Sequence, residues 1–314
     1  MTNESNAVIK TVVPFKGAPL SIELFESDAQ QVAARTIILY GDSGLGKSTN
    51  ARFFAQYMYE LTGKPVRLVA AEDSSKSIFQ PLIDVKIVQP IFLTKALDAV
   101  SVVRKLGRGD WPVFKSNGTL DRWMSLKEWN GSVSAYICEG LTSICEQLLE
   151  QFREEGRFIR EQSDSFITLA GEKVGASSQA AYGVTQMEGI RSIKAFGMLP
   201  VSRVLWTAHE ASKTSLDGNE PVRGPALVGS AASASIKKYV GLLLHVDAMP
   251  QPDKTRKPRV FFKQHADAKN ANLYYPAKTT VPPECVDLLE KEFPGGYFDP
   301  GLNYGSGIDQ FLRV

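Results

Sequence analysis

Short apolar runs alternate with amphipathic segments along most of the chain. The runs at residues 37–40, 66–71, 133–138, 201–207 and 240–246 are mostly apolar, which is typical of strands buried on both faces of a sheet. Between them, apolar side chains recur every three or four residues, as they do along one face of a helix. The alternation predicts an α/β fold with a mainly parallel sheet flanked by helices.

The expected helices lie between and after these strands. They cover residues 51–61, 94–106, 142–152, 183–198 and 284–293. Thr94 is expected to cap the second helix, and Thr142 or Ser143 the third, because hydroxyl side chains accept hydrogen bonds from the free N–H groups at a helix start. Each helix is expected to pack its apolar face on the sheet.

Shorter strands are expected outside this alternation. Residues 85–88 resemble a brief strand, while 260–262 and 273–275 are expected to pair with each other. Two further short strands, at 8–15 and 21–25, are expected ahead of the core. The sheet is therefore predicted to carry antiparallel outer strands.

The chain divides into one large unit with two extensions. Residues 1–34 are assigned to an N-terminal extension, 35–280 to the core and 281–314 to a C-terminal helix and tail. The core carries an insertion at about 107–130 in which tryptophans alternate with basic residues. Such a segment can bind single-stranded nucleic acid by stacking and phosphate contact. The alternative, which we favour, is that the tryptophans pack onto the core, since tryptophan is mostly buried on average.

A glycine-rich segment joins the first apolar run to the first expected helix. It reads Gly41-Asp42-Ser43-Gly44-Leu45-Gly46-Lys47-Ser48, and Thr49 follows it. Glycines let the backbone turn tightly, so that successive N–H groups and the positive end of the helix dipole point at one anion. In such a loop Lys47 reaches the β and γ phosphates and the Ser48 hydroxyl ligates Mg²⁺. The segment predicts a binding site for ATP and Mg²⁺.

Composition narrows the function classes only slightly. The chain is 43% hydrophobic and 22% charged, as in ordinary globular proteins. Lysine and arginine exceed aspartate and glutamate by only 36 to 34, so the net charge argues neither for nor against a nucleic-acid partner. No apolar stretch approaches the roughly 20 residues of a membrane span, and the polar start does not resemble a signal peptide. We therefore expect a cytoplasmic protein with no membrane contact.

The cysteines support the same cellular location. Cys138, Cys145 and Cys285 are odd in number and lack metal-ligand spacing. Unpaired cysteines of this kind are typical of a reducing compartment. Cys138 and Cys145 stand in apolar surroundings and are expected to be buried.

Polar residues stand at the ends of the predicted strands. Glu72 follows the run 66–71, Glu139 follows 133–138, and His209 follows the run that ends at residue 207. Nucleotides bind at the carboxyl ends of parallel strands. Hydrolysis of a γ-phosphate requires a phosphate cradle, a metal, a group that orients water and positive charge on the transition state. The sequence offers a candidate for each.

The order of these features resembles the RecA-like ATPase core, and most closely the small RecA-type ATPases of bacteriophages that assist single-strand annealing and recombination. The resemblance covers roughly residues 35 to 265. It rests on the glycine-rich segment, on Ala70-Ala71-Glu72-Asp73, on Tyr136 to Ser143, on Leu205 to Glu210, and on Gly229 through Tyr239. Only the glycine-rich segment is specific alone, and the others gain weight from their order.

The resemblance implies a role for several residues. Glu72 takes the place of the carboxylate that activates water, and His209 that of the polar residue that senses the γ-phosphate. Lys237, with Lys238 beside it, matches a lysine that reaches the nucleotide of a neighbouring subunit in filaments. Glu139 stands where the family usually has an aspartate that holds Mg²⁺ through water. Its extra methylene moves the carboxylate, which puts the rate of turnover in doubt.

The resemblance also implies partners. A homo-oligomer with ATP between its subunits is expected, acting on single-stranded DNA in the cytoplasm of a bacterial host. The polar loop 211–223, with Lys213 and Arg223, is the expected nucleic-acid contact. Phage recombination or replication proteins are the expected protein partners.

Two other functions compete with a DNA-dependent ATPase. The first is a nucleotide-gated assembly or binding protein with little hydrolysis, which the glutamate at position 139 motivates. The second is a phosphotransferase of the phosphate-loop kinase type. Such enzymes usually place an arginine-rich lid over the phosphates, and no compact lid is obvious in the sequence, so this hypothesis ranks last.

Overall fold

The computed structural model describes most of the chain from residue 35 onward. The described ranges are 35–93, 98–154, 166–169, 172–175, 179–213, 222–228, 236–250, 256–266, 274–275, 277–279, 283–301 and 303–313. Thr94 and the strands expected at 8–15 and 21–25 lie outside these ranges. Within them, no helix is long and apolar enough to cross a membrane.

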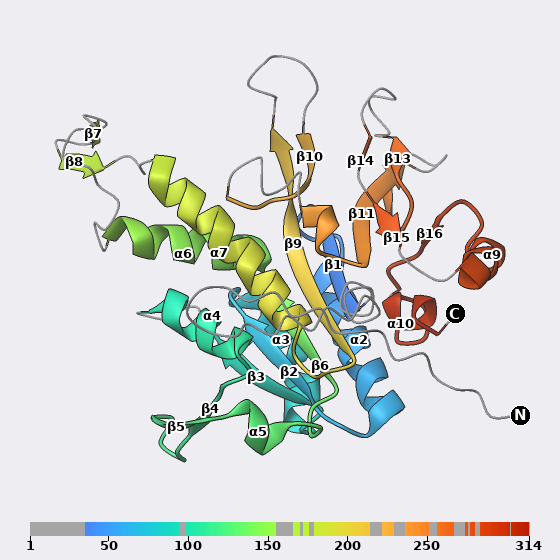
Figure 1. Ribbon diagram of the computed structural model, residues 1–314. Helices are drawn as coiled ribbons and strands as arrows, with labels where there is room; N and C mark the ends of the chain where they lie inside the picture. The colour runs from blue at the N-terminus through green and yellow to red at the C-terminus, as the bar shows by residue number, and fades with distance from the viewer. Residues whose placement is uncertain are drawn as a thin grey trace, which may run out of the picture.

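Parallel strands form the centre of a ten-stranded sheet (Figure 1). In spatial order they are β3 (Val88–Phe92), β2 (Val66–Ala70), β6 (Ala135–Glu139), β9 (Arg203–Lys213), β1 (Thr36–Gly41) and β11 (Leu242–Pro250). Every neighbouring pair in this order is parallel. All residues of β1, β2 and β6 are buried, which confirms that the apolar runs form strands covered on both faces.

Antiparallel strands complete the sheet, as expected for its outer part. They are β10 (Val222–Pro225) beside β9, β12 (Arg256–Phe261) and β15 (Lys278–Thr279) beside β11, and β16 (Tyr297–Phe298) beside β12. The expected pairing of 260–262 with 273–275 is wrong, because β14 (Tyr274–Tyr275) pairs with β13 (His265–Ala266) instead. The tail contributes β16 to the main sheet, so at this point it is part of the core.

Helices cover both faces of the sheet (Figure 1). Residues of α4 (Ala99–Gly107), α5 (Leu126–Trp129), α6 (Leu141–Glu154) and α7 (Gln179–Gly197) contribute to one apolar cluster. Residues of α2 (Lys47–Thr62), α3 (Ser74–Asp84), α9 (Pro283–Glu292) and α10 (Ile308–Phe311) contribute to another. Ile38 belongs to the first cluster and Ile37 to the second, because successive side chains of a strand point to opposite faces.

The insertion is a hairpin followed by a single helical turn. β4 (Trp111–Phe114) pairs with β5 (Leu120–Met124), and α5 follows. Trp111 and Trp129 are buried, and the guanidinium of Arg67 lies between their rings, 4.3 and 4.2 Å from the two ring centres. Arg67 also donates a 2.7 Å hydrogen bond to the Tyr136 hydroxyl. These tryptophans therefore pack onto the core and stabilise a buried cation.

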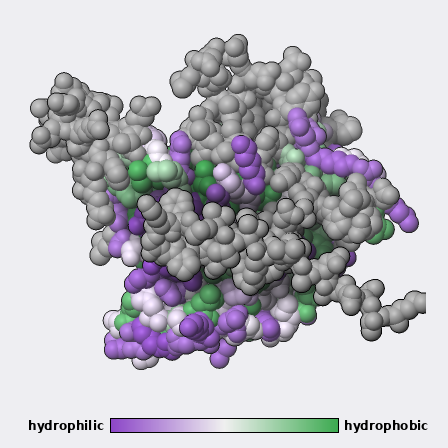
Figure 2. Space-filling model, viewed as in Figure 1, coloured by the Kyte–Doolittle hydropathy of each residue, from purple (hydrophilic) through white to green (hydrophobic). Residues whose placement is uncertain are grey.

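The outer side of the insertion is hydrophilic. Hydrophilic side chains gather along the lower edge of the molecule in Figure 2, where Figure 1 places β4, β5 and α5. Arg122 and Glu128 form an exposed ion pair there, at 2.5 Å. Trp123 is half-buried beneath the ammonium group of Lys105, which lies 4.6 Å from the ring centre. The insertion thus separates a packed inner side from a solvated outer side.

Several expected boundaries are wrong for local reasons. Residues 85–87 form a turn in which Lys86 has a φ of 61°, and the strand begins at Val88. The helix expected from residue 94 begins at Ala99, where the Asp98 side chain accepts a 2.9 Å hydrogen bond from the Ser101 N–H. An aspartate in this position caps the helix as well as a threonine would.

The two middle helices also start earlier than expected. α6 begins at Leu141, so Thr142 and Ser143 lie inside its first turn and do not cap it. The Thr142 hydroxyl instead donates to the Ala226 carbonyl and accepts from the His209 N–H. α7 begins at Gln179 and runs through the glycine at 183. Two short strands, β7 (Phe166–Leu169) and β8 (Glu172–Gly175), lie in a segment for which no strand was expected.

Candidate nucleotide-binding site

The glycine-rich loop joins the end of β1 to the start of α2, as predicted. Gly46 has a φ of 88° and occupies the position before the first helical residue. A Cβ on Gly41 would lie 2.3 Å from the Val246 carbonyl oxygen of the neighbouring strand β11. Positive φ at Gly46 and close backbone approach at Gly41 both favour glycine. The loop therefore presents its backbone at the carboxyl edge of the sheet, at the start of a 16-residue helix.

Lys47 lies at the centre of this loop. Its side chain folds back, and Nζ donates hydrogen bonds of 2.9 Å to the Gly41 carbonyl and 2.7 Å to the Asp42 carbonyl. The residue is only 8% exposed. Burial lowers the pKa of the Lys47 ammonium, while the negative charges of Glu139 and Glu72 oppose that shift. The loop thus holds a partly desolvated cation against backbone carbonyls, where a phosphate oxygen is a stronger partner.

Ser48 and Glu139 form the second pair of the site. The Ser48 hydroxyl donates to Oε1 of Glu139, which ends strand β6. Oε2 of Glu139 is buried and has no hydrogen-bond partner among the described residues. Burial raises the pKa of the Glu139 carboxyl to about 7, and the hydrogen bond from Ser48 opposes this shift. A hydroxyl beside a buried carboxylate oxygen without a partner is a donor set that fits Mg²⁺.

Glu72 and His209 form the third pair. Nε2 of His209 lies 3.2 Å from Oε1 of Glu72, and both side chains are partly exposed. The hydrogen bond from His209 holds the pKa of Glu72 below its usual value, against the effect of burial. The backbone N–H of His209 is itself held by the Thr142 hydroxyl at 3.0 Å. Glu72 is therefore an ionised acceptor in a fixed place, which suits a group that orients water.

These side chains line one cavity of 310 Å³ at the carboxyl edge of the sheet. Its lining includes Ser43, Gly44, Gly46, Lys47, Ser48, Thr49, Glu72, Ser74, Ile78, Glu139, Thr207 and His209. The loop residues and the three strand-end residues named from the sequence thus come together. Gly41, Asp42 and Leu45 belong to the same loop without lining the cavity.

Three other predicted residues have side chains outside the described part of the chain. Lys237 lies in the short 3-10 helix η1 (Ile236–Lys238), and its side chain lies outside the described part of the chain. Lys213 and Arg223 stand on β9 and β10, which pair as a hairpin. The loop expected over 211–223 is therefore too long, since strand β9 continues to Lys213 and β10 starts at Val222. Their side chains are also outside the described part.

Asn50 is a residue of the site that sequence reasoning missed. It is fully buried in α2, and its amide nitrogen donates 2.9 Å to the Gly46 carbonyl of the loop. Its amide oxygen accepts a 3.0 Å hydrogen bond from the Ile308 N–H at the start of α10. Asn50 thus ties the loop to a part of the tail more than 250 residues away in sequence.

The tail makes further contacts with the same helix. The Tyr57 hydroxyl donates 3.2 Å to the Leu312 carbonyl, and the Tyr304 hydroxyl bonds to Glu60. Phe311 packs on the rings of the second apolar cluster, which also contains residues of α2. The C-terminal helix and tail, residues 281–314, thus brace the helix that follows the loop.

A chain of buried polar groups lies next to the site. Oε2 of Glu210, the residue after His209, lies 3.0 Å from Nε2 of His245 on β11. The other ring nitrogen of His245 lies 3.2 Å from Nε2 of His265. His245 is fully buried, and its contact with Glu210 crosses the end of β1, which lies between β11 and β9. These polar contacts link Glu210 on β9 to β11 and β13.

The cysteines are confirmed as buried where the structure describes them. Cys138 and Cys145 are free thiols with almost no exposed surface. Burial raises the pKa of Cys145 to about 12. Both thiols are therefore unreactive and belong to the packing of the core.

Comparisons with known proteins do not add to this geometry. No protein-family model matches the chain, and no curated protein matches it. Function is therefore inferred from the residues of the site.

Proposed function

We propose that the protein is a RecA-like P-loop ATPase that binds ATP with Mg²⁺ beside the glycine-rich loop and acts on single-stranded DNA, in phage-type recombination, annealing or replication. One observation carries the proposal. A phosphate-binding loop, a hydroxyl–carboxylate pair and an ionised glutamate meet in one cavity at the carboxyl edge of a mainly parallel sheet. These residues are candidates for three of the four requirements for γ-phosphate hydrolysis, and their proximity supports the proposal.

Each pair has a separate task in this proposal. Lys47 exchanges its two carbonyl partners for phosphate oxygens, because an ionic partner forms the stronger hydrogen bond. Ser48 and Glu139 hold Mg²⁺, which neutralises phosphate charge when bound. Glu72 orients a water molecule, and His209 holds the Glu72 carboxylate in place. The fourth requirement, positive charge from a neighbouring subunit, is assigned to Lys237 of a homo-oligomer.

The DNA partner is assigned to the β9–β10 hairpin. His209 and Lys213 lie on the same strand, and Arg223 lies on the strand paired with it. A change in the Glu72–His209 contact therefore acts on the strand that carries the hairpin. This continuity supports a link between the nucleotide and a nucleic acid bound at the hairpin, in which Lys213 and Arg223 contact phosphates.

The test is the rate of ATP hydrolysis by the purified full chain with single-stranded DNA, with duplex DNA and without DNA, at two salt concentrations. We expect Mg²⁺-dependent hydrolysis that single strands stimulate, and less stimulation at the higher salt concentration. ATP binding with a hydrolysis rate near background under all conditions would contradict the ATPase and favour the second function below.

The second function is a nucleotide-gated assembly protein with little hydrolysis. The observation that favours it is the direct hydrogen bond between Ser48 and Glu139, together with the raised pKa of the buried Glu139 carboxyl. To hold Mg²⁺, Ser48 and Glu139 would have to give up this bond and Glu139 would have to lose its proton in a buried place, which disfavours fast turnover. A nucleotide-dependent change in oligomer size without hydrolysis, measured by light scattering, distinguishes this function from the first.

A further inference from the structure

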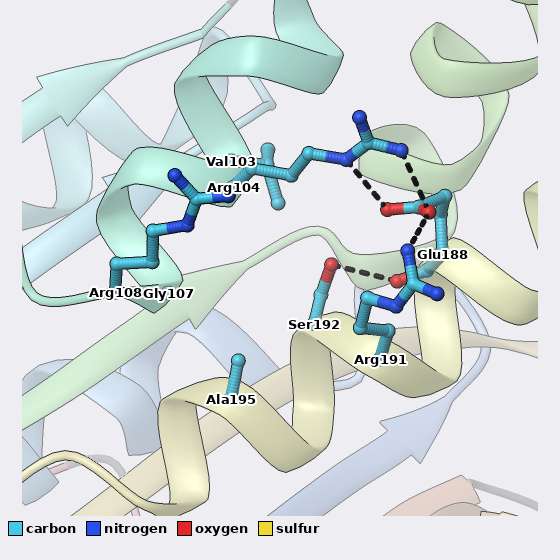
Figure 3. Close-up of a pocket in the computed structure, with 8 residues that line it drawn as sticks. All are labelled: Val103, Arg104, Gly107, Arg108, Glu188, Arg191, Ser192 and Ala195. Carbon is cyan, nitrogen blue, oxygen red and sulfur yellow. Dashed lines mark hydrogen bonds and ion pairs between the residues drawn. The ribbon is translucent and has the colours of Figure 1, made fainter. Parts of the chain in front are cut away.

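A second cavity lies between helices α4 and α7, away from the nucleotide site (Figure 3). It measures 460 Å³ and shares no lining residue with the nucleotide cavity. Both helices pack on the face of the sheet opposite α2. This cavity is therefore a separate feature of the fold.

Small residues explain why the two helices approach closely at one end of the cavity. A Cβ on Gly107 of α4 would lie 3.1 Å from the Cβ of Ala195 on α7. One to two turns away from this contact, the facing residues are long and charged: Arg104 on α4, and Glu188 and Arg191 on α7. The space between the helices is thus closed by small side chains at one end and bordered by ionic groups at the other.

The ionic groups form a fixed arrangement around one carboxylate. Arg104 donates two hydrogen bonds to Glu188, of 3.0 and 2.8 Å, and Arg191 donates one of 2.6 Å to the same carboxylate. The Glu188 side chain is 7% exposed, whereas those of Arg104 and Arg191 are 46% and 66% exposed. In Figure 3 both guanidinium groups converge on Glu188. The carboxylate therefore orients two arginines whose side chains remain partly or largely exposed.

The cavity has an excess of positive charge. Glu188 balances only one of the two guanidinium groups that contact it. Arg108 adds a third, and its guanidinium has no ion pair or hydrogen bond within the described part of the chain. Asp98, at the start of α4, is a further negative charge that acts on Arg104, but it does not line the cavity. The lining thus carries three arginines and one carboxylate.

The chemistry of these donors favours phosphate over carboxylate as the ligand. A planar carboxylate takes a two-bond fork from one guanidinium, as Glu188 does from Arg104, and Arg191 adds a single bond to the same group. A phosphate group presents oxygens around a tetrahedral centre, so it can accept hydrogen bonds from guanidinium groups that approach from two helices. We propose that the α4–α7 cavity is a second anion site that binds phosphate groups, with Arg108 and Arg191 as direct ligands and Glu188 as the residue that positions Arg104 and Arg191.

Phosphate groups of this kind come from two sources, a nucleic-acid strand or a free polyphosphate, and the two probes below distinguish them. The first is a fluorescein-labelled oligothymidylate. The second is inorganic pyrophosphate, measured by calorimetry in a Lys47→Ala background so that the glycine-rich loop does not contribute. Arg108 and Arg191 do not line the nucleotide cavity. Loss of nucleotide binding and loss of phosphate binding between α4 and α7 are therefore separate results.

The test compares Arg108→Gln and Arg191→Gln with Arg256→Gln in the full chain. Arg256 is an exposed arginine on the outer strand β12, so its change removes the same charge elsewhere. We expect Arg108→Gln and Arg191→Gln each to weaken the binding of one of the two probes about 5- to 10-fold. If that probe is the oligonucleotide, the slope of log affinity against log salt concentration should fall by about one unit. The control is expected to change affinity less than 2-fold. Equal affinities for all three variants, or no binding of either probe, would overturn the proposal.

Glu188→Gln gives an effect of the opposite sign. The amide oxygen still accepts hydrogen bonds from Arg104 and Arg191, while the negative charge is lost. We expect Glu188→Gln to bind the same probe several-fold more tightly than the natural chain does. The arginine variants are expected to keep an unchanged melting temperature. A purely structural role of the cluster predicts no gain in affinity, so unchanged binding by Glu188→Gln would place the phosphate elsewhere.

Discussion

The cavity at the glycine-rich loop, where we propose that the nucleotide binds, and the α4–α7 cavity hold their charges in different ways. In the first, Lys47, Glu139 and Glu72 lie on a loop and at strand ends, and burial or a neighbour shifts the pKa of each. In the second, exposed arginines stand on helix surfaces around a single buried carboxylate. A backbone loop at a sheet edge can therefore fix the position and protonation of individual groups, whereas two facing helices determine mainly the sign of the charge in the space between them.

The difference also determines how each cavity is found. Residues 41–48 of the nucleotide site are contiguous, so their spacing is visible in the sequence. The residues of the α4–α7 cavity come from two helices about 80 positions apart, and nothing in the spacing of either helix indicates the other. We expect substitutions in the first cavity to have the larger effects, because its groups are less solvated.

The largest effect is expected from Lys47→Ala. It removes the principal side-chain partner of the phosphates, so ATP affinity should fall at least about 100-fold. The matched control is Lys64→Ala, which removes an exposed lysine just beyond the same helix. Calorimetric titration with Mg²⁺-ATP measures both. Normal affinity in Lys47→Ala would mean that the loop does not bind the nucleotide.

Glu72→Gln should slow hydrolysis about 100- to 10,000-fold while ATP affinity changes little, because the amide cannot take the proton of the attacking water. Glu146→Gln on the exposed side of α6 is the control. Steady-state ATPase rates and ATP titrations are measured on the same samples. Unchanged turnover would remove Glu72 from the role of orienting water.

Glu139 should make the stability of the metal-free protein depend on pH. Its pKa is raised from 4.5 to about 7 by burial, so the folded state retains a proton that the unfolded state loses. The stabilisation is present below about pH 4.5 and is lost as pH rises through 7, by up to about 3 kcal/mol. Urea unfolding at pH 5.5 and pH 8 should show this loss in the natural chain and not in Glu139→Gln. If the free energy of unfolding of the natural chain and of Glu139→Gln depended equally on pH, the raised pKa of Glu139 would be contradicted.

Asn50→Ala should have the smallest effect of this series, a loss of about 1 to 3 kcal/mol in the free energy of unfolding. The change leaves the Gly46 carbonyl and the Ile308 N–H without their side-chain partner. Gln56→Ala, which removes an exposed hydrogen bond to Glu60 on the same helix, is the control. A similar melting temperature for both variants would show that the tail does not brace the loop.

The parallel core could be predicted from sequence because each strand is a continuous apolar run. Helix α3 could not, since Pro81 lies inside it and the turn at Lys86 interrupts the pattern before β3. The strand β16 and the helix α10 are too short to show a period. Their positions are decided by contacts with β12 and α2, which are distant in sequence.

The candidate site divides in the same way. The loop and the strand ends follow from spacing and from the rule that parallel strands end at one edge of the sheet. Asn50 and Thr207 are visible only in three dimensions, because their partners Ile308 and Gly140 lie elsewhere in the chain.

The central claim is that ATP binds at the glycine-rich loop, and hydrogen–deuterium exchange of the full chain tests it most directly. We expect Mg²⁺ with a slowly hydrolysed ATP analogue to slow exchange in peptides covering residues 41–48, and Lys47→Ala to abolish this protection. Peptides from α4 and α7 report on the second cavity in the same experiment. Unchanged exchange at residues 41–48 under saturating nucleotide would contradict the account.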